Sequence, residues 1–471
     1  MRTPEVEHAL DNASSYEEWL QAAQDHDRLT GLAAWREDDE SPHYEASALR
    51  ADIARMRELR TTGKALELAR HLDHELGRQL NDLSSPELYD SALAGTKHLV
   101  EAYLETVESS LRWLAATEIV GLSRQAKTAR FQVAEKVFGR SALLLSGGAT
   151  WGFHHLGVVK ALMDLGLLPH ILSGASTGAM IAAGVCTRSD AELRGMFEDT
   201  DQLRLDGLLP FGLRKAWDQG AWLDPARLYE VLLNNVGGWT FAEAFARSGR
   251  ALNISVSPTR SRQKPRLLCH LTSPDVLVAS AALASSALPT LFPPIELRSR
   301  GPDGEEPYVA GERWVDGSLY GDLPKLRLAR LHNVNHFVVS QTNPHVMPFL
   351  RRYDRQGLRT AVMGAAGSAV RHQSTLVTDI ARRAAPGPLR QLADQAHALV
   401  SQDYSGDILL HPRFRPALLT RIATNPTRED LADFIREGER SVWPRVAAIR
   451  DQTRIGRTFR SCLSQLGAKL A

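Results

Sequence analysis

The sequence predicts an α/β fold in which a mainly parallel sheet carries helices on both sides, with helical segments before and after it. Three observations predict this class. Residues 139–186 alternate short apolar runs, glycine-rich turns and helix-like stretches in a βαβα order, which is typical of a parallel sheet. Further strand candidates follow at 251–257, 266–271 and 336–340. Apolar residues in 14–138 recur at helical spacing, with few strand-like runs.

Composition indicates a folded protein with several domains. The chain has 471 residues, of which 43% are apolar and 24% are charged, and these values exclude a disordered or collagen-like chain. A chain of this length predicts two or three domains. We expect a helical accessory domain at 1–138, a sheet-bearing domain at 139–345 and a mainly helical, basic region at 346–471.

Charge is divided unevenly along the chain although the net charge is only +1. Residues 1–138 contain 25 acidic and 16 basic side chains, whereas 139–471 contain 30 acidic and 40 basic ones. Such a division is compatible with a basic face for an anionic surface or substrate, with attraction between the two parts, or with evenly solvated charge.

Cysteine use and the chain's start bear on the compartment. Cys186, Cys269 and Cys462 lie far apart without Cys-x-x-Cys spacing, so the sequence predicts neither a disulfide framework nor a zinc site. The first thirty residues are polar and acidic, unlike a signal peptide, and no apolar run reaches the roughly 18–20 residues that cross a bilayer. We expect a cytoplasmic protein whose membrane contact, if any, is peripheral.

A helix-capping pattern near the start of the chain supports the helical accessory domain. Ser14 and Ser15 precede Glu17 and Glu18 by a few positions, which is a helix-capping pattern. We find no cluster of chemically reactive side chains in this part of the chain.

The strongest chemical signal is a Gly-x-Ser-x-Gly pattern at 174–178, between a strand-like and a helix-like run. It is the pattern of a nucleophile elbow, a tight strand-to-helix turn that exposes a serine at the carboxyl edge of the sheet. Gly174 and Gly178 are needed because side chains there would collide with the neighbouring strand and helix. Ser176 is therefore the candidate nucleophile.

A glycine-rich loop at 146–152 follows the first predicted strand. Its spacing fits neither a dinucleotide-binding loop nor a phosphate-binding P-loop. Consecutive glycines before a helix leave backbone N–H groups free to stabilise a developing oxyanion. Gly147 and Gly148 are the candidate glycines, and a turn without any ligand is the alternative.

A Val-Asp-Gly sequence at 315–317 supplies a candidate base. A serine nucleophile needs a group to accept its proton, and Gly317 permits the close backbone approach that would bring Asp316 to the hydroxyl. An Asp-Gly pair on its own is usually only a turn. Asp322 is a second carboxylate in this region. The leucine and proline that follow it indicate a structural turn.

Together, these three motifs resemble the patatin-like acyl hydrolases. The stretches 16–31, 284–294, 315–324 and 333–345 are similar to a subgroup of triacylglycerol lipases from yeast lipid droplets and plant oil seeds. The resemblance covers most of 15–345 and implies a patatin-like three-layer sandwich that uses a Ser–Asp dyad without a histidine.

Carried over by position, the resemblance makes Ser176 the nucleophile and Asp316 the base of the dyad. It assigns the oxyanion hole to three loop positions and adds four motif glycines. The hole comprises Gly147, Gly148 and Ala149, and the motif glycines are Gly152, Gly174, Gly178 and Gly317. Two positions depart from the family pattern: Ala149 replaces a common third glycine, and Trp151 replaces a common Lys or Arg. Loss of that basic side chain favours a neutral ester over a phospholipid.

Histidines offer a different mechanism. His332, His336 and His345 follow Asp316 in the Ser, Asp, His order of an ordinary α/β-hydrolase triad. His154 and His155 next to the glycine-rich loop are interpreted as packed or surface residues.

Two segments have lipid-binding character, each with a plainer alternative. Residues 346–390 interleave arginines with apolar residues, which suits an anionic interface or a basic helical bundle against the acidic N-terminal part. Residues 208–223 hold Phe211, Trp217 and Trp222 close together, either as a lid or as buried aromatic residues.

The sequence thus predicts a serine lipid acyl hydrolase acting on tri- or diacylglycerol. A phospholipase A or an acyltransferase with the same dyad is the alternative within the class, and a catalytically silent lipid-binding scaffold is the alternative outside it. We expect no metal and no organic cofactor, because the steps need none. The expected partners are a lipid ester and a membrane or lipid-droplet surface, and nucleic acid is not expected.

Overall fold

The computed structural model describes residues 3–77, 83–260, 263–344, 346–347, 404–413 and 422–468, which form two compact units. The helical unit comprises residues 1–141, 332–336 and 442–471, and the sheet unit comprises 142–331 and 337–441. The predicted boundaries after 138 and 345 stay predictions, because compactness alone does not define an independently folding domain.

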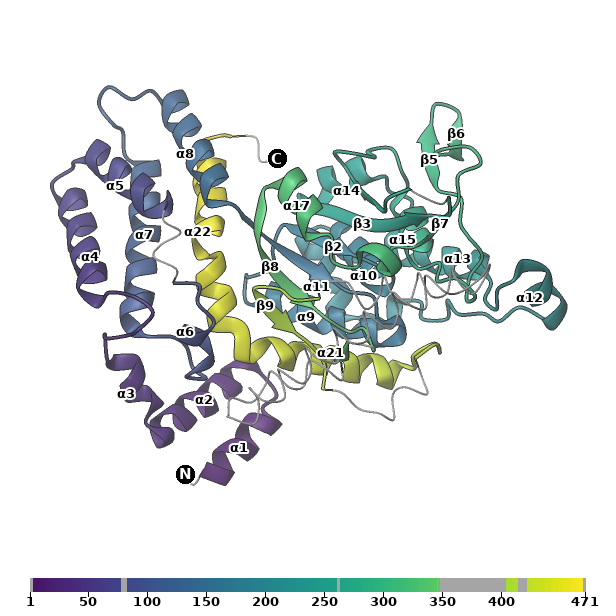
Figure 1. Ribbon diagram of the computed structural model, residues 1–471, viewed down its shortest axis with the longest axis horizontal. Helices are drawn as coiled ribbons and strands as arrows, with labels where there is room; N and C mark the ends of the chain where they lie inside the picture. Colours follow the sequence, from purple (N-terminus) through teal and green to yellow (C-terminus); the bar gives the residue numbers. More distant parts are fainter. Residues whose placement is uncertain are drawn as a thin grey trace, which may run out of the picture. The chain divides into compact units, whose positions relative to one another are not determined.

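A single sheet organises the sheet unit, and the predicted α/β class is confirmed (Figure 1). In the described residues this sheet has seven strands in the order β4-β3-β2-β1-β8-β9, and β7 also pairs with β3. The strands are β1 (Arg140–Leu145), β2 (Ile171–Gly174), β3 (Ala251–Pro258), β4 (Arg266–Cys269), β7 (Trp314–Asp316), β8 (Val334–Ser340) and β9 (Ile408–Leu410). A separate hairpin pairs β5 (Arg298–Gly301) with β6 (Gly304–Pro307).

Parallel pairing joins β1 to β2, β2 to β3 and β8 to β9, whereas β4 and β7 run antiparallel to β3. Leu143, Leu144 and Leu145 are fully buried in β1. A strand that is apolar on both faces is expected in the middle of a parallel sheet covered by helices. The strands expected at 251–257, 266–271 and 336–340 correspond to β3, β4 and β8.

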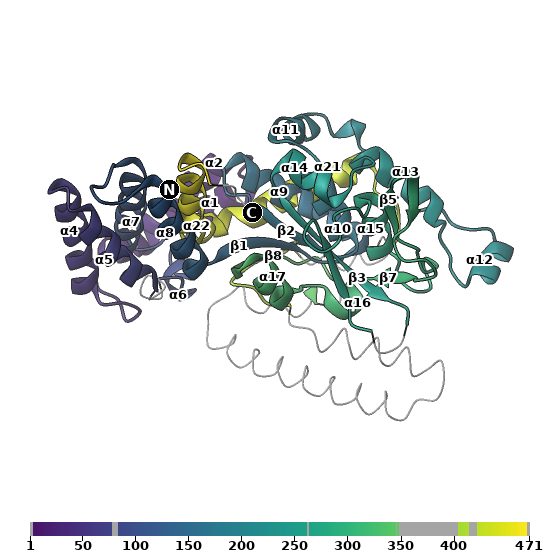
Figure 2. The same ribbon diagram turned by 90° about the horizontal axis from the view of Figure 1, so that it is seen from above.

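Helices flank the sheet on both sides, with α10 and α14 on one side and α17 on the other (Figure 2). The helices and helical turns of this unit are η2 (Ala149–Phe153), α9 (His154–Asp164), α10 (Thr177–Cys186), α11 (Asp190–Glu198), η3 (Thr200–Gln202), α12 (Leu213–Gln219), α13 (Pro225–Val236), α14 (Phe241–Ser248), α15 (Val278–Ser285), α16 (Ser318–Gly321), α17 (Lys325–His332) and α21 (Arg428–Val442). Helix α10 has buried residues on nearly every face, as expected of a helix in the interior of the unit.

A close backbone crossing attaches α21 to α9. A Cβ added at Gly157 would overlap the Ile435 carbonyl oxygen, and one added at Gly438 would overlap the His154 carbonyl oxygen. Both helices therefore need glycine at the crossing.

The helical unit is built from the N-terminal helices and the last helix of the chain. Its elements are α1 (Thr3–Asn12), α2 (Tyr16–Thr30), α3 (Leu32–Glu37), α4 (Ala46–Thr61), α5 (Ala65–Gly77), α6 (Glu87–Asp90), α7 (His98–Ala116), α8 (Arg124–Phe138), η5 (Trp443–Arg445) and α22 (Val446–Gln465). The capping pattern is confirmed, since the Ser15 hydroxyl accepts the Glu18 amide at 3.3 Å.

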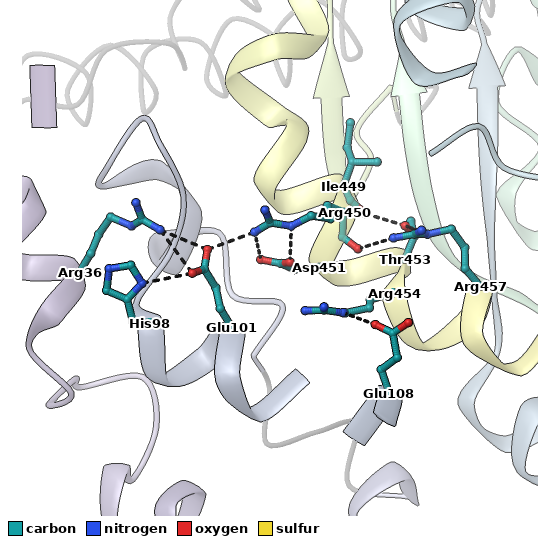
Figure 3. A network of polar contacts seen from close by, with 10 residues as sticks. All are labelled: Arg36, His98, Glu101, Glu108, Ile449, Arg450, Asp451, Thr453, Arg454 and Arg457. Atoms are coloured by element: carbon teal, nitrogen blue, oxygen red, sulfur yellow. Dashed lines mark hydrogen bonds and ion pairs between the residues drawn. The ribbon is translucent and has the colours of Figure 1, made fainter. Parts of the chain in front are cut away.

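Ion pairs bind α22 to α7 inside the helical unit (Figure 3). The Arg450 guanidinium lies 3.1 Å from Glu101, which also pairs with Arg36 at 3.2 Å, and Arg454 lies 2.5 Å from Glu108. Basic side chains from the end of the chain thus neutralise acidic side chains from its beginning. At α22, the basic surplus of residues 139–471 is thus attracted to the acidic surplus of residues 1–138.

None of the described helices combines the length and the apolar character that a bilayer crossing requires.

Candidate active site

Ser176 occupies the turn between β2 and α10, as the elbow pattern predicts. Its backbone has φ 53° and ψ −127°, a conformation that L-residues rarely adopt. Strain of this kind persists only where the surroundings impose it, and it is a known feature of nucleophile elbows. The Ser176 amide donates to the Ser285 hydroxyl at 3.0 Å, which in turn donates to the Ser255 carbonyl at 2.7 Å.

Each motif glycine lies where a side chain has no room. A Cβ at Gly174 would overlap the Gly178 carbonyl, one at Gly178 the Leu145 carbonyl, and one at Gly317 the Ser255 carbonyl. A Cβ at Gly152 would overlap the Thr177 side chain. Gly152 therefore lets the glycine-rich loop approach the elbow, Gly178 lets α10 approach β1, and Gly317 lets the chain after β7 approach β3.

The glycine-rich loop lies beside the elbow. A Cβ at Gly147 would be 3.4 Å from the Ser176 Cβ, and the Thr177 hydroxyl donates to the Ala149 carbonyl at 2.8 Å. Ala149 has φ 49°. Gly148 and Ala149 stand at the start of η2, where backbone amides have no partner within the helical turn. These two amides are available to an anion next to Ser176.

The Gly147 amide differs from its two neighbours because it is already engaged. It donates to the Asp322 carboxyl at 2.8 Å. This contact shapes the loop and leaves Gly148 and Ala149 as the better candidates for oxyanion donors.

Asp316 ends β7 and is fully buried beside the elbow. Burial raises the pKa of its carboxyl to about 6, although hydrogen bonds with Ser318 and with the Ser176 side chain act to lower it. The Ser318 amide donates to Asp316 at 2.7 Å. The Ser176 side chain, 140 positions earlier in the sequence, is thus close enough to affect the Asp316 pKa, and no histidine of the described residues contributes to that shift.

Asp322 is a second buried carboxyl and holds the loop. Besides the Gly147 amide it accepts the Asn343 side-chain amide at 2.6 Å. Burial raises its pKa to about 8, and the negative charge of Asp316 adds to that rise. Different environments therefore give the two carboxyls different proton affinities, and Asp316 is the one that ionises at lower pH.

We expect Asp322→Ala to lower kcat/KM for a soluble ester by about 10- to 100-fold, because the glycine-rich loop loses its anchor and its amides move away from the reacting carbonyl. Asp322→Asn keeps one acceptor oxygen and should lose less activity. Steady-state kinetics with a p-nitrophenyl ester measure both variants. Wild-type activity in Asp322→Ala would contradict the anchoring role.

The two histidines next to the glycine-rich loop, His154 and His155, are both fully buried. His155 is buried, with Nδ1 2.7 Å from the Ser340 hydroxyl and Nε2 2.9 Å from the Ser146 carbonyl. Since a carbonyl only accepts, Nε2 carries the proton. Burial lowers the His155 pKa to about 4, and it lowers the His154 pKa well below its usual range. Both are neutral packing residues, as expected.

Of the histidines in the alternative triad, His336 contacts Ser141 at 3.0 Å and Gln452 at 2.8 Å within the helical unit. His332 is buried, and His345 lies outside the described residues. Nearly all of the basic segment 346–390 also lies outside them.

An apolar cavity opens beside Ser176. Ala149, Ser176 and Thr177 line its reactive end. Leu, Val, Ile and Met side chains from α10, α13 and the segment before α12 form much of the rest, together with Phe153, Phe292, Arg188 and Arg204. Such a lining suits a long aliphatic chain and excludes a strongly polar one.

Several supporting residues were not identified as functional from the sequence. Ser285, Thr342 and Asn343 lie in stretches that carry the family resemblance, but nothing in the sequence indicates that they contact the elbow or the loop. Thr150 is held by the carbonyls of Ile422 and Thr424, more than 270 positions away, at 2.9 and 2.8 Å.

One group of side chains in the helical unit has metal-binding geometry. Asp52, His71 and Glu75 place one potential ligand atom each within 4.8 Å of one another. The Tyr103 hydroxyl already donates to Glu75 at 3.3 Å. This group belongs to the helical unit, and Ser176 and Asp316 belong to the sheet unit.

Comparison with known proteins agrees with this geometry. Residues 143–326 match the model of the family described as patatin-like phospholipase, and residues 1–136 match a domain of unknown function, DUF3336. Triacylglycerol lipase ptl3 of Schizosaccharomyces pombe is 31% identical over 97% of this chain and 96% of its own length. The chain belongs to the patatin-like phospholipase family. The predicted resemblance and the predicted class, a carboxylic ester hydrolase, are thus confirmed.

Two further members give the same assignment. Triacylglycerol lipase 4 of Saccharomyces cerevisiae is 32% identical over 93% of this chain, which spans about half (51%) of that relative's length. A patatin-like phospholipase domain-containing protein of Neosartorya fischeri is 32% identical over 97% of this chain and 68% of its own length.

Proposed function

We propose that this patatin family member is a serine lipid acyl hydrolase that cleaves tri- or diacylglycerol with a Ser176–Asp316 dyad. The observation that carries the proposal is the proximity of the Ser176 side chain to the fully buried Asp316 carboxyl, beside an apolar cavity that Ser176 lines. Ester cleavage by a serine needs a hydroxyl and a base that accepts its proton, and the apolar cavity suits an acyl chain.

The proposed reaction begins when Ser176 Oγ attacks the ester carbonyl carbon and its proton passes to Asp316. The amides of Gly148 and Ala149 stabilise the oxyanion of the tetrahedral intermediate. The intermediate collapses to an acyl-serine, and the departing alcohol takes the proton back from Asp316. Water then attacks the acyl-serine, with Asp316 again as base, and releases the fatty acid.

Burial suits Asp316 to this role. A carboxyl with the ordinary pKa of about 3.9 would be a poor base near neutral pH. The raised pKa brings its proton affinity closer to the working pH while leaving it mostly ionised there.

A neutral ester is the proposed substrate for two reasons. Trp151, where many family members carry a basic residue, is buried in an apolar cluster with Val346, Met347, Tyr404 and Phe434, so it offers no charge to a phosphate. Two of the named relatives are triacylglycerol lipases, which supports the same substrate class.

A phospholipase A remains the second candidate because two cationic side chains, Arg188 and Arg204, line the cavity. In either case we propose that the substrate is met at a membrane or lipid-droplet surface by a cytoplasmic enzyme.

The deciding experiment compares tri-, di- and monoacylglycerols with phospholipids as substrates for wild type, Ser176→Ala and Asp316→Asn. We expect the acylglycerols to be cleaved faster, with the activity lost in both variants. Equal or faster cleavage of phospholipid would favour phospholipase A. Products measured with and without an added diacylglycerol acceptor separate hydrolysis from acyl transfer.

The pH profile should report the state of Asp316. Only the ionised carboxylate accepts the Ser176 proton, so kcat/KM rises with pH until Asp316 is deprotonated. The acidic limb should therefore have its midpoint near the Asp316 pKa of about 6, with a tenfold loss of rate per pH unit below it. A soluble p-nitrophenyl ester is the substrate of choice, and activity unchanged down to pH 4 would contradict this assignment.

A further inference from the structure

The segment that carries α12 exposes large apolar side chains to solvent. Leu213 is 82% exposed and Trp217 is 89% exposed, and the flanking Leu209 and Trp222 are 49% and 57% exposed. Of the two alternatives for 208–223, buried aromatic residues are wrong for both tryptophans. Isolated exposed apolar residues are common, but four within fourteen positions form a patch that calls for a partner.

This patch lies on a braced projection. In both views α12 stands apart from the other helices of the sheet unit (Figures 1 and 2). The Phe211 amide donates to the Trp222 carbonyl at 2.8 Å, and the Leu223 amide donates to the Leu291 carbonyl at 2.8 Å. These bonds fix the base of the projection, so its side chains are presented outward by a fixed framework.

The arrangement of side chains on α12 matches a lipid–water interface. Leu213 and Trp217 are four positions apart and therefore share one helix face. Tryptophan favours the interfacial zone of a bilayer, and a neighbouring cation favours lipid phosphates. Arg214 is exposed and forms no ion pair with any described residue, whereas Lys215 pairs with Asp224 at 3.4 Å.

The projection is also continuous with the proposed substrate site. Leu208 and Leu223, at its two ends, line the apolar cavity that reaches Ser176, and so does Leu291. The residues exposed at the tip and the residues that line the cavity are thus parts of one segment. Lipid held at the tip would therefore lie next to a segment that also lines the cavity.

We propose that the exposed patch of the α12 projection, called the α12 tip and defined as Leu213, Arg214 and Trp217 of α12 with the flanking Leu209 and Trp222, inserts into a phospholipid surface and anchors the enzyme there. This inference builds on the proposed function, since it takes the substrate to lie in a lipid phase. Removing the apolar side chains of the patch from water lowers the free energy. The Arg214 guanidinium would lie at the level of the lipid phosphates.

The test is flotation of the full chain with phosphatidylcholine vesicles that contain phosphatidylserine. All variants carry Ser176→Ala so that no lipid is consumed. Leu213→Ser combined with Trp217→Ser should weaken vesicle binding by at least about tenfold. Leu213→Phe combined with Trp217→Leu keeps the apolar character and should bind as the parent does.

A matched control removes exposed apolar surface elsewhere: Val120→Ser combined with Leu271→Ser, at positions 97% and 54% exposed, should leave binding unchanged. Equal binding by the parent and the Leu213→Ser, Trp217→Ser variant would overturn the proposal, as would a parent that does not float. If the patch binds a protein partner and not lipid, the parent and this variant will float equally little, which also overturns the proposal.

A second readout separates this inference from the proposed function. With Ser176 restored, Leu213→Ser plus Trp217→Ser should leave kcat/KM for soluble p-nitrophenyl butyrate within twofold of wild type and lower the rate on emulsified triacylglycerol. If wild type fails to cleave the soluble ester yet floats through the α12 tip, the proposed chemistry fails while the docking surface stands.

Discussion

Replacing Asp316 by asparagine is expected to lower kcat/KM for a soluble ester by about 10³-fold. Asparagine has nearly the same shape and still hydrogen-bonds Ser176, but its amide cannot take up the serine proton. The fold should therefore persist while the chemical step is lost. Steady-state kinetics with a p-nitrophenyl ester measure the loss, and circular dichroism checks the fold.

Two control variants distinguish Asp316 from its rivals. Asp322→Asn changes the neighbouring carboxyl and should cost far less, because Asp322 positions the Gly147 amide and is not the proposed base. His345→Ala should leave the activity near that of wild type. A severe loss in His345→Ala with substantial activity in Asp316→Asn would support the Ser, Asp, His triad instead.

Replacing Gly178 by alanine is expected to lower the free energy of unfolding by about 3 kcal/mol or more and kcat/KM by at least about 100-fold. The new methyl group would overlap the Leu145 carbonyl oxygen at the end of β1. A backbone atom in the middle of a sheet cannot move aside easily, so α10 must shift and carry Ser176 with it. Urea denaturation and ester kinetics give the two values.

Gly184→Ala is the matched control within the same helix. A Cβ there would meet only the Arg188 guanidinium, at 3.6 Å, and alanine favours a helix more than glycine does. Stability should stay the same or rise by up to about 1 kcal/mol. If Gly178→Ala were as stable and active as Gly184→Ala, the close approach of α10 to β1 would not be what holds the elbow.

The parts of this fold and site that the sequence predicts are those with local signals. The Gly-x-Ser-x-Gly turn of Ser176 is specified by its own five residues, and the buried strand β1 by an uninterrupted apolar run. The turn and the strand are both determined by residues that are close in sequence, so a short stretch of sequence is enough to predict them.

Long-range contacts have no such signal. The Asp322 contact with the Gly147 amide joins residues 175 positions apart, and a carboxyl next to leucine and proline looks like an ordinary turn. The assignment of α22 to the helical unit depends on pairs such as Arg450 with Glu101, 349 positions apart.

Exposure is equally hard to infer from the sequence. Trp217 occupies a helix whose residue pattern would suit a buried face as well as a lipid-facing one, and only the structure shows it 89% exposed. Large aromatic residues are usually mostly buried because burial is favourable, so a sequence pattern alone does not predict their exposure.

Covalent labelling with a fluorophosphonate, followed by peptide mass spectrometry, tests the central claim most directly, because the reagent reacts with a serine only where a base and an oxyanion site activate it. We predict a single adduct on the peptide that contains Ser176, absent in Ser176→Ala and formed much more slowly in Asp316→Asn. Labelling that persists in Ser176→Ala, or that occurs on another serine, would contradict the assignment of Ser176 as the nucleophile.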